Sequence, residues 1–253
     1  MPVPVTLQTD AALIEIFSSI QGEGMLVGCR QVFLRLPHCN LNCRYCDTDF
    51  AATEFCQVED PPGSGQLRAL ANPLSLAQVQ RLIESWCREA PGAHHSISLT
   101  GGEPLVSHEL LAAWLPVLRK LLPIYLETNG TLPAELEQLL PHVDWVSMDI
   151  KLSSQTGLPT DWDAHRKFLQ IANRTNCYVK MVVGENTPAL ELLQGAKLVA
   201  AVSGEIPLIL QPVTVDGKIN ISTSNLLEMQ RLVATHHSNV RIIPQTHRFM
   251  GLL

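Results

Sequence analysis

The feature that most constrains the fold is an alternation of strand-like and helix-like segments between Gln31 and Ile243. Short runs of hydrophobic and β-branched residues predict strands, and longer runs with apolar residues at helical spacing predict helices. Repeated strand–helix units form a parallel sheet with right-handed crossover connections. The pattern contains six such units and a last strand, whereas a closed barrel has eight. We therefore expect an α/β fold built as an open, partial barrel of the (β/α)6 type.

The element boundaries follow from these patterns and from cap residues. Ser75 and Gln78 have the spacing of a capping box, so the first helix is expected to run from Ser75 to about Arg88. The other helices are predicted over Glu109–Leu122, Pro133–Leu139, Asp161–Ala172, Pro188–Ala201 and Leu226–Thr235. The strands are predicted over Gln31–Leu36, Ser96–Leu99, Ile124–Leu126, Trp145–Met148, Tyr178–Val183, Pro207–Leu210 and Val240–Ile243.

The length of the chain bounds the number of domains. A chain of 253 residues, 46% of them hydrophobic, can bury one large core, and we expect a single domain over residues 1–253. Residues 51–73 contain the sequence EDPPGSG, which is rich in turn-forming residues. This segment is expected to be a loop or an insertion within the domain.

Charge and hydropathy argue against two classes of partner. A net charge of -6 and a pI of about 5.8 provide no overall positive field for nucleic acid. The longest apolar run, Leu110–Leu118, has nine residues, whereas a membrane-spanning helix needs about 20. The N-terminal segment has no pattern of a secretory signal. We therefore expect a cytoplasmic protein with no nucleic-acid or membrane partner, whose cysteines are reduced.

Polar or glycine-rich segments follow most of the predicted strands. They read HCNLNC, TGGEP, ETNGT, SMDIK, QPV and PQTH, in chain order. The carboxyl ends of parallel strands lie on one side of a sheet, and the active sites of such folds are found there. These segments are therefore expected to converge on one site.

Three closely spaced cysteines, Cys39, Cys43 and Cys46, follow the first predicted strand in a C-x3-C-x2-C pattern. Structural zinc usually takes four ligands, and electron-transfer clusters take four cysteines. Three thiolates suit a 4Fe-4S cluster in which one iron is open to another ligand. The alternative is a zinc site with a distant fourth ligand such as His38 or Cys56. The scattered Cys29, Cys56, Cys87 and Cys177 are expected to be ordinary apolar side chains.

The cysteine pattern resembles that of the radical S-adenosylmethionine superfamily, in which the open iron is chelated by the methionine end of the cosubstrate. The TGGEP and ETNG segments resemble its cosubstrate-binding strand ends, and a side chain at Gly102 is expected to occupy space that the ligand needs. The resemblance implies S-adenosylmethionine contacts at Tyr45, Cys46, Asp47, Gly101, Gly102, Glu103, Glu127, Asn129, Ser147, Lys151 and Gln211.

A finer resemblance is to the 7-carboxy-7-deazaguanine synthase family of queuosine and 7-deazapurine biosynthesis. It rests on EIFSSIQGEGMLVG, VFLRLPHCNLNCRYCDTDF, TGGEPL, ETNG and IIPQTHRFMGL, and it extends from Glu15 to the end of the chain. It implies a carbon–nitrogen lyase in which a 5′-deoxyadenosyl radical takes hydrogen from C6 of 6-carboxy-5,6,7,8-tetrahydropterin. The skeleton then rearranges, ammonia leaves and 7-carboxy-7-deazaguanine forms. It also implies a homodimer and an external electron donor such as flavodoxin or ferredoxin.

The same resemblance implies further sites. Thr48 matches the family's protein ligand for Mg²⁺. Arg35 lies in an otherwise apolar strand, and its guanidinium suits the substrate carboxylate; the alternative is a salt bridge to Glu15 or Glu23. The implied substrate contacts are Ile20, Gln21, Gly22, Arg35, Thr100, Gln245 and His247.

Two other functions remain as alternatives at this point. A glycyl-radical activating enzyme shares the cysteine spacing and the barrel, although the QGEG, CDT and PQTH segments argue against it. A non-catalytic zinc or iron–sulfur module would use the cysteines for binding alone.

Overall fold

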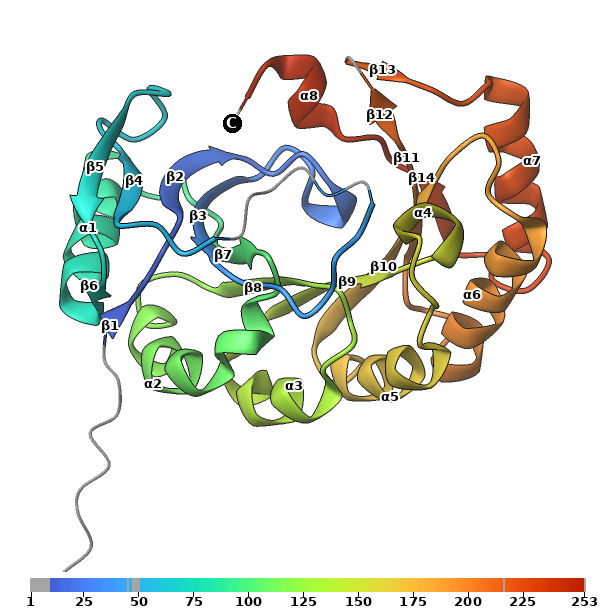
Figure 1. Cartoon of the computed structure of the whole chain (residues 1–253), viewed down its shortest axis with the longest axis horizontal. Helices are drawn as coiled ribbons and strands as arrows, with labels where there is room; N and C mark the ends of the chain where they lie inside the picture. Colours follow the sequence, from blue (N-terminus) through green and yellow to red (C-terminus); the bar gives the residue numbers. More distant parts are fainter. Residues whose placement is uncertain (1–9, 45, 47–50, 216, 253) are drawn as a thin grey trace, which may run out of the picture.

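The computed structural model describes residues 10–44, 46, 51–215 and 217–252, and ten strands of this part form one curved sheet (Figure 1). Seven of them, from β3 to β14, are parallel neighbours, and the order is β14-β11-β10-β9-β8-β7-β3-β2-β4-β5. The prediction of an open, partial barrel is therefore confirmed. The strands are β2 (Glu15–Ile20), β3 (Arg30–Leu36), β4 (Phe55–Glu59), β5 (Leu67–Ala71), β7 (Ser96–Gly101), β8 (Ile124–Thr128), β9 (Trp145–Ile150), β10 (Asn176–Val183), β11 (Leu208–Pro212) and β14 (Val240–Ile242).

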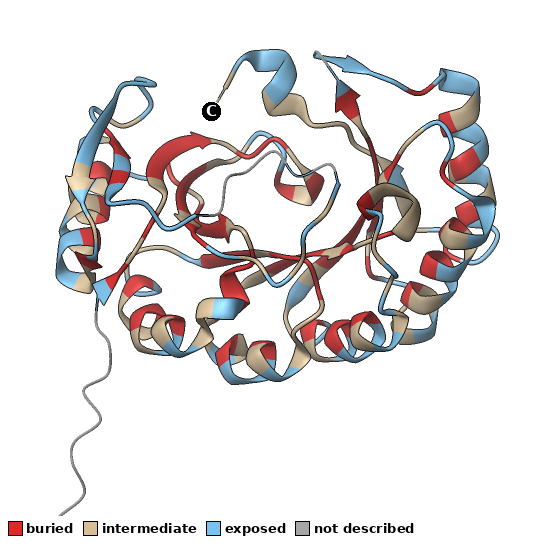
Figure 2. Ribbon diagram, viewed as in Figure 1, coloured by how far each residue is buried: buried red, intermediate tan, exposed pale blue. Residues whose placement is uncertain are grey.

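Helices cover the convex side of the parallel strands, while the concave side is open toward the C-terminal segment (Figure 1). The exposed faces of these helices point away from the sheet (Figure 2). The helices are α1 (Leu76–Glu89), α2 (His108–Leu118), α3 (Pro133–Leu139), α4 (Ser153–Thr156), α5 (Trp162–Ala172), α6 (Ala189–Val202), α7 (Thr223–Ala234) and α8 (Thr246–Met250). Short 3-10 turns are η1 (Gly24–Leu26), η2 (Pro104–Ser107) and η3 (Leu140–His142), and two small ladders pair β1 (Asp10–Ala11) with β6 (Leu74–Ser75) and β12 (Thr214–Val215) with β13 (Lys218–Ile219). Among the described helices, none is both long enough and apolar enough to cross a membrane.

Local signals explain where several helices begin. The predicted capping box at α1 is present, because Ser75 Oγ accepts from the Gln78 N–H and the Gln78 side chain accepts from the Ser75 N–H. Helix α7 begins at Thr223 rather than at the predicted Leu226, since Ser222 caps it by accepting from the Asn225 N–H. A cap residue therefore moved this boundary by three residues relative to the apolar pattern.

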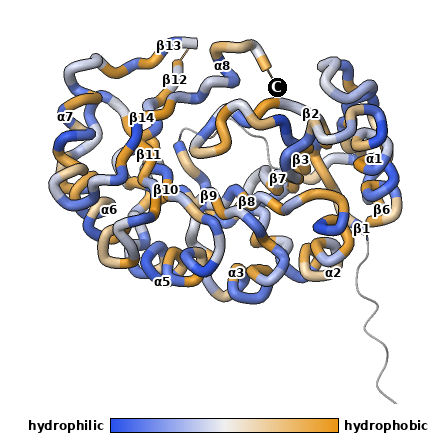
Figure 3. The backbone as a smooth tube through the Cα atoms, turned by 180° about the vertical axis from the view of Figure 1, so that it is seen from behind, coloured by the Kyte–Doolittle hydropathy of each residue, from blue (hydrophilic) through white to orange (hydrophobic). Residues whose placement is uncertain are grey.

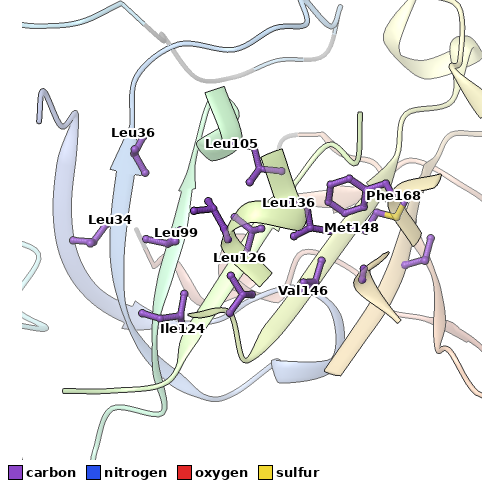
Figure 4. Packing of buried hydrophobic residues seen from close by; sticks show 14 of the residues in the cluster. Leu34, Leu36, Leu99, Leu105, Ile124, Leu126, Leu136, Val146, Met148 and Phe168 are labelled. Carbon is purple, nitrogen blue, oxygen red and sulfur yellow. The ribbon is translucent and has the colours of Figure 1, made fainter. Parts of the chain in front are cut away.

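Side chains of the central strands alternate between two very different faces. On the outer face, apolar side chains such as Leu99, Leu126 and Met148 pack against the helices in one large core (Figure 4). On the inner face, the intervening positions include Ser98, Glu127 and Lys180. Hydrophobic and hydrophilic positions accordingly alternate along the tube of the central strands (Figure 3). The outer face provides the buried apolar area, and the inner face is left for polar side chains.

A smaller apolar cluster lies on the inner face, toward the amino ends of the strands. Leu26, Tyr125, Tyr178 and Ile209 form it, and the hydroxyl groups of the two tyrosines are hydrogen-bonded to each other. Burial raises the pKa of Tyr178 to about 12. These uncharged rings fill the interior at this end, so the polar inner face is accessible from the carboxyl ends of the strands.

Residues 51–73, predicted to be a loop or an insertion, are not an irregular loop. They contain an antiparallel hairpin, β4 and β5, whose first strand pairs with β2 and extends the main sheet. The turn residues EDPPGSG occupy the last position of β4 and the hairpin loop. The carboxylate of Glu59, which is 1% exposed, accepts hydrogen bonds from the N–H groups of Ser18, Gly63 and Gly65 at 2.7–2.8 Å. The exposed edge strand β5 has little apolar periodicity, which is why the pattern did not reveal it.

We predict that Glu59→Ala lowers the free energy of unfolding by about 2 kcal/mol, because three N–H groups lose a charged acceptor. Urea denaturation followed by circular dichroism measures this change. Glu54→Ala is the matched control, since Glu54 is exposed in the same segment, and it should change the stability by less than about 0.5 kcal/mol. Equal effects of the two substitutions would contradict the role of Glu59.

Candidate functional site

Two adjoining cavities lie at the carboxyl ends of the parallel strands. The first, of about 240 Å³, is lined by residues that follow β3, β7, β8, β9, β11 and β14, as the convergence of these segments predicted. The second, of about 610 Å³, lies toward β2, β3 and the C-terminal segment. The residues that line both cavities are Glu23, Thr100, Glu127, Gln245 and Arg248.

The three cysteines Cys39, Cys43 and Cys46 line the first cavity. Burial raises the pKa values of the Cys39 and Cys43 thiols, and the nearby Cys46 raises them further, whereas Lys151 lowers them. Thiolates are the ligands of iron–sulfur clusters, and Lys151 would favour that ionised form. The donor set and its shared cavity therefore fit a cluster with three cysteine ligands. Among the described residues, no three His, Cys, Asp or Glu side chains converge as the ligands of a single ion would.

The scattered cysteines lie elsewhere, as predicted. Cys56 is fully buried in the apolar core, where desolvation raises its pKa to about 12. Cys87 and Cys177 pack against the same core, and Cys29 packs against the smaller cluster. Cys56, the candidate fourth ligand of a zinc site, is a core side chain in this structure.

The Gly101–Gly102 turn brings two strand ends into direct backbone contact. The Gly102 N–H donates to Leu36 O at 3.2 Å, and the Glu103 N–H donates to His38 O at 2.8 Å. A Cβ atom at Gly102 would lie 1.8 Å from His38 O, so a side chain there would first meet the backbone of the cysteine loop. The expectation that it would occupy ligand space stays a prediction. Gly101 has φ +131° and a Cβ there would lie 2.1 Å from Leu36 O. Gly101 and Gly102 are therefore required for the backbone of residues 36–38, which leads into the cysteine loop, to lie this close to the end of β7.

Glu103 is fully buried and does not line either cavity. Its carboxylate accepts from the N–H groups of Leu105 and Asn129 and from Thr128 Oγ1 at 2.7–3.1 Å. Burial raises its pKa to about 7, although these hydrogen bonds oppose the shift. In this structure Glu103 thus ties the end of β7 to the end of β8.

The other predicted cosubstrate residues fall into two groups. Gly101, Gly102, Glu127, Asn129, Lys151 and Gln211 line the first cavity. Ser147 is 1% exposed and does not line either cavity. Gln211 is also buried, and within the described part of the chain its Oε1 atom has no hydrogen-bond partner. A buried acceptor without a donor is costly, so this atom suits a donor supplied by a ligand.

The predicted substrate residues line the second cavity without exception. They are Ile20, Gln21, Gly22, Arg35, Thr100, Gln245 and His247. The C-terminal segment is held on the turn after β2, because the Thr246 N–H donates to Gly22 O at 2.8 Å. A Cβ atom at Gly22 would lie within 2.6 Å of His247 Cβ, so this approach also depends on glycine.

Arg35 forms the salt bridge to Glu15 that was the alternative to substrate binding. Its Nε atom lies 2.5 Å from Glu15 Oε1, and each side chain is 24% exposed. The guanidinium also lies over the ring of Phe17, 5.7 Å from its centroid. Phe17 and Phe33 are stacked on each other at 4.8 Å in the wall of the second cavity. This wall therefore offers a cation beside a flat apolar surface.

A polar network underlies the wall that separates the two cavities. The Gln21 side-chain N–H groups donate to Glu127 Oε1 at 2.8 Å and to Gln31 Oε1 at 3.0 Å. Thr100 Oγ1 donates to Glu127 Oε2 at 2.9 Å, and Gln21 Oε1 accepts from the Glu23 N–H. Glu127 is thus fixed by side chains from the turn after β2 and from β7.

The sequence analysis missed several polar residues of the site, among them Glu23, Asp149 and Lys180. Glu23 was considered only as a partner of Arg35, yet it pairs with Lys180. Asp149 and Lys180 occupy inner-face positions in WVSMDI and in YVKMVV. The sequence did contain a signal for Asp149 and Lys180. Each is a charged residue within a strand that is otherwise mostly apolar, as buried parallel strands are. The predicted sites Tyr45, Asp47 and Thr48 lie outside the described residues.

Comparisons with known proteins agree with this geometry. A sequence model of the radical SAM superfamily matches residues 34–184. A 7-carboxy-7-deazaguanine synthase of Geobacter sulfurreducens is 51% identical over 96% of this chain and 98% of its own. Another, of Methanothermobacter thermautotrophicus, is 33% identical over 96% and 98%. The crystal structure of QueE from Escherichia coli has a TM-score of 0.58 at 21% identity, covering 94% of this chain and 95% of that one, which shows the same fold.

We predict that Gly102→Ala lowers the iron content of the anaerobically reconstituted protein by about half or more, because overpacking displaces the backbone that carries Cys39. Iron and sulfide analysis measures this loss. Gly204→Ala is the matched control, since a Cβ atom there meets nothing within 4 Å. Normal iron content in Gly102→Ala would show that the cysteine loop tolerates the added carbon.

Proposed function

Because the chain belongs to the 7-carboxy-7-deazaguanine synthase family of the radical SAM superfamily, we propose that it converts 6-carboxy-5,6,7,8-tetrahydropterin to 7-carboxy-7-deazaguanine with loss of ammonia. The structural observation that carries this proposal is the pair of cavities with a common wall. One contains the three thiols, and the other contains all the predicted substrate residues. Family membership leaves the two alternative functions, a glycyl-radical activating enzyme and a non-catalytic metal module, without support.

The first cavity holds the 4Fe-4S cluster and the cosubstrate in this proposal. When bound, they supply the radical that starts the rearrangement. Cys39, Cys43 and Cys46 bind three irons and leave the fourth open. Lys151 would face the carboxylate of S-adenosylmethionine, and the Oε1 atom of Gln211 would accept a hydrogen bond from a donor group of the cosubstrate. The other residues assigned to the cosubstrate complete or support this pocket, namely Tyr45, Asp47, Gly101, Gly102, Glu103, Glu127, Asn129 and Ser147.

The second cavity holds the pterin. Arg35 offers its remaining guanidinium N–H groups to the substrate carboxylate while Nε stays on Glu15. The stacked rings of Phe17 and Phe33 provide the apolar wall. Thr48, assigned from the family resemblance, would contribute an oxygen ligand to a Mg²⁺ ion, which prefers oxygen donors. The rest of the wall is formed by Ile20, Gln21, Gly22, Thr100, Gln245 and His247.

The remaining elements of the proposal concern partners. The cluster needs an electron from outside the chain, and flavodoxin or ferredoxin is the proposed donor. We also propose a homodimer that acts in the cytoplasm, without nucleic-acid or membrane partners.

The proposed function predicts that the reduced wild-type protein forms 7-carboxy-7-deazaguanine from S-adenosylmethionine and the carboxytetrahydropterin under anaerobic conditions. Cys43→Ala should abolish product and cosubstrate cleavage, because one iron loses its thiolate. Cys87→Ala is the control and should retain both, since Cys87 packs against the core. Mass spectrometry detects the product. A wild-type protein that binds a cluster but forms no product would contradict the proposed reaction.

Arg35→Ala should weaken the affinity for the pterin by about 30-fold or more, because a charged hydrogen bond contributes about 2 kcal/mol. Glu15→Gln is the matched control, since it removes the ion pair but leaves the guanidinium in the cavity wall. It should change the affinity by less than about threefold. Anaerobic titration calorimetry measures both values. If the two variants lose equal affinity, Arg35 serves only as the partner of Glu15.

A further inference from the structure

A chain of four alternating charges connects the walls of the two cavities. The Lys180 ammonium forms an ion pair with Glu23 Oε2 and lies 3.3 Å from Asp149 Oδ1. Asp149 Oδ2 in turn lies 2.9 Å from Lys151 Nζ. Glu23 lines both cavities, whereas Asp149 and Lys151 line the one with the cysteines. Lys180 is 4% exposed and does not line either cavity, so it acts through its neighbours.

The fold brings these residues together from distant parts of the sequence. Lys180 on β10 is the direct sheet partner of Asp149 on β9, so both side chains project to the inner face. Glu23 forms its ion pair with Lys180 from the turn between β2 and η1, and this segment lies in the interior of the barrel (Figure 1). Gln245, from the C-terminal segment, donates to the second Glu23 oxygen, Oε1, at 2.8 Å. Glu23 is therefore held from two sides while it faces the cavities.

The ionisation of the two acids in this row of charges, Glu23 and Asp149, depends on Lys180. Burial by itself would raise the pKa of Glu23, but the charge and hydrogen bond of Lys180 lower it to about 2. Burial also acts against the ionised form of Asp149, whose pKa is nevertheless lowered by Lys151 and Lys180. Both carboxylates are thus ionised at neutral pH. Without Lys180, Asp149 would keep Lys151, whereas Glu23 would keep only the hydrogen bond from Gln245 and the charge of His247, so Glu23 would be expected to take up a proton.

Stability alone does not account for a buried ammonium at this position. Removing an ammonium ion from water costs several kcal/mol, and replacing a buried ion pair by apolar side chains is often neutral or stabilising. Tyr178 and Val182, the adjacent inner-face positions on β10, show that large uncharged side chains fit this strand. The charge of Lys180 is better explained by its effect on the carboxylate that faces the cavities.

We propose that Lys180 is a positioning residue for the pterin, which keeps the Glu23 carboxylate ionised and oriented as an acceptor for N–H groups of the bound ring. This inference rests on the proposed function, since it takes the pterin as the ligand of the second cavity. The pyrimidine part of a pterin presents an amino group and a ring N–H on one edge. A fixed, ionised carboxylate matches two adjacent donors of this kind. Lys180 itself does not touch the substrate.

A double-mutant cycle tests this role, with the pterin affinity of the reconstituted protein measured by anaerobic titration calorimetry. Lys180→Met should weaken pterin binding by about tenfold or more in the wild-type background. In the Glu23→Gln background the same substitution should cost less than about threefold, because Lys180 then no longer has the Glu23 carboxylate to orient. Arg119→Met is the control, since it breaks an ion pair with Asp144 outside both cavities, and it should leave the affinity unchanged.

The pH dependence provides a readout that a purely structural role would not change. The groups that face the Glu23–Lys180 pair are Asp149, Glu127, Tyr178 and His247. Because the Glu23 pKa is far below neutrality in the wild type, its carboxylate stays ionised between pH 6 and 8.5. In Lys180→Met the carboxylate loses its cation and ionises only as the pH rises, so binding should strengthen with pH relative to the wild type. His247 is present in both proteins, so the ratio of their affinities reports the two acids that lose Lys180, and the same comparison in the Glu23→Gln background separates Glu23 from Asp149.

The outcomes separate this inference from the proposed function. Costs that add in the double variant, or a Lys180→Met profile parallel to the wild type, would overturn the role of Lys180 and leave the function intact. A wild-type protein that does not bind the pterin would overturn both. If Lys180→Met does not fold, as judged by circular dichroism, Glu23→Gln and the double variant are compared directly. Equal affinities support the proposal, and a further tenfold loss in the double variant overturns it.

Discussion

The division of the parallel strands into an apolar convex face and an inner face that is polar toward the carboxyl ends is the constraint on which the rest of the structure depends. Parallel sheets are normally covered on both faces and are therefore apolar on both. Here the helices cover only the convex face, where Leu99, Leu126 and Met148 lie. The concave face carries Thr100, Glu127 and other polar groups, which a closed apolar barrel could not hold. Stability is thus supplied by one face, and ligand chemistry is left to the other.

The second determinant is the direct backbone contact between the ends of β3 and β7. The hydrogen bonds of Gly102 to Leu36 O and of Glu103 to His38 O fix the first residues of the cysteine loop to the sheet. The buried carboxylate of Glu103 then fixes the end of β8, because it accepts a hydrogen bond from the Asn129 N–H. One loop can therefore present thiols in a defined place although it follows a single strand. A side chain larger than glycine at residue 102 would break this sequence of contacts at its start.

Much of the fold and of the cavity lining follows from local sequence signals. Strand–helix alternation, cap residues such as Ser75 and the polar segments after each strand depend on a few neighbouring residues, so the barrel and its rim were predictable. The β4–β5 hairpin was not, because it is stabilised by Glu59 through contacts with Ser18 and with its own loop. Likewise, the motif TGGEP indicated a ligand turn, but the atoms closest to Gly102 belong to His38, more than sixty residues earlier. Non-local contacts of this kind leave no periodic signal.

The charges of the inner face are paired before any ligand arrives, and this has a consequence for binding. Arg35 is on Glu15, and Lys180 lies between Glu23 and Asp149. A buried charge without a partner would have to be hydrated, and a ligand would then pay for removing that water. Paired charges instead keep their orientation while the cavities exchange solvent for ligand, so less reorganisation is needed at the moment of binding. Each pair still leaves N–H groups or carboxylate lone pairs toward a cavity. The inner face is therefore already ordered for recognition, and the apolar convex face offsets the free-energy cost of holding these charges out of water.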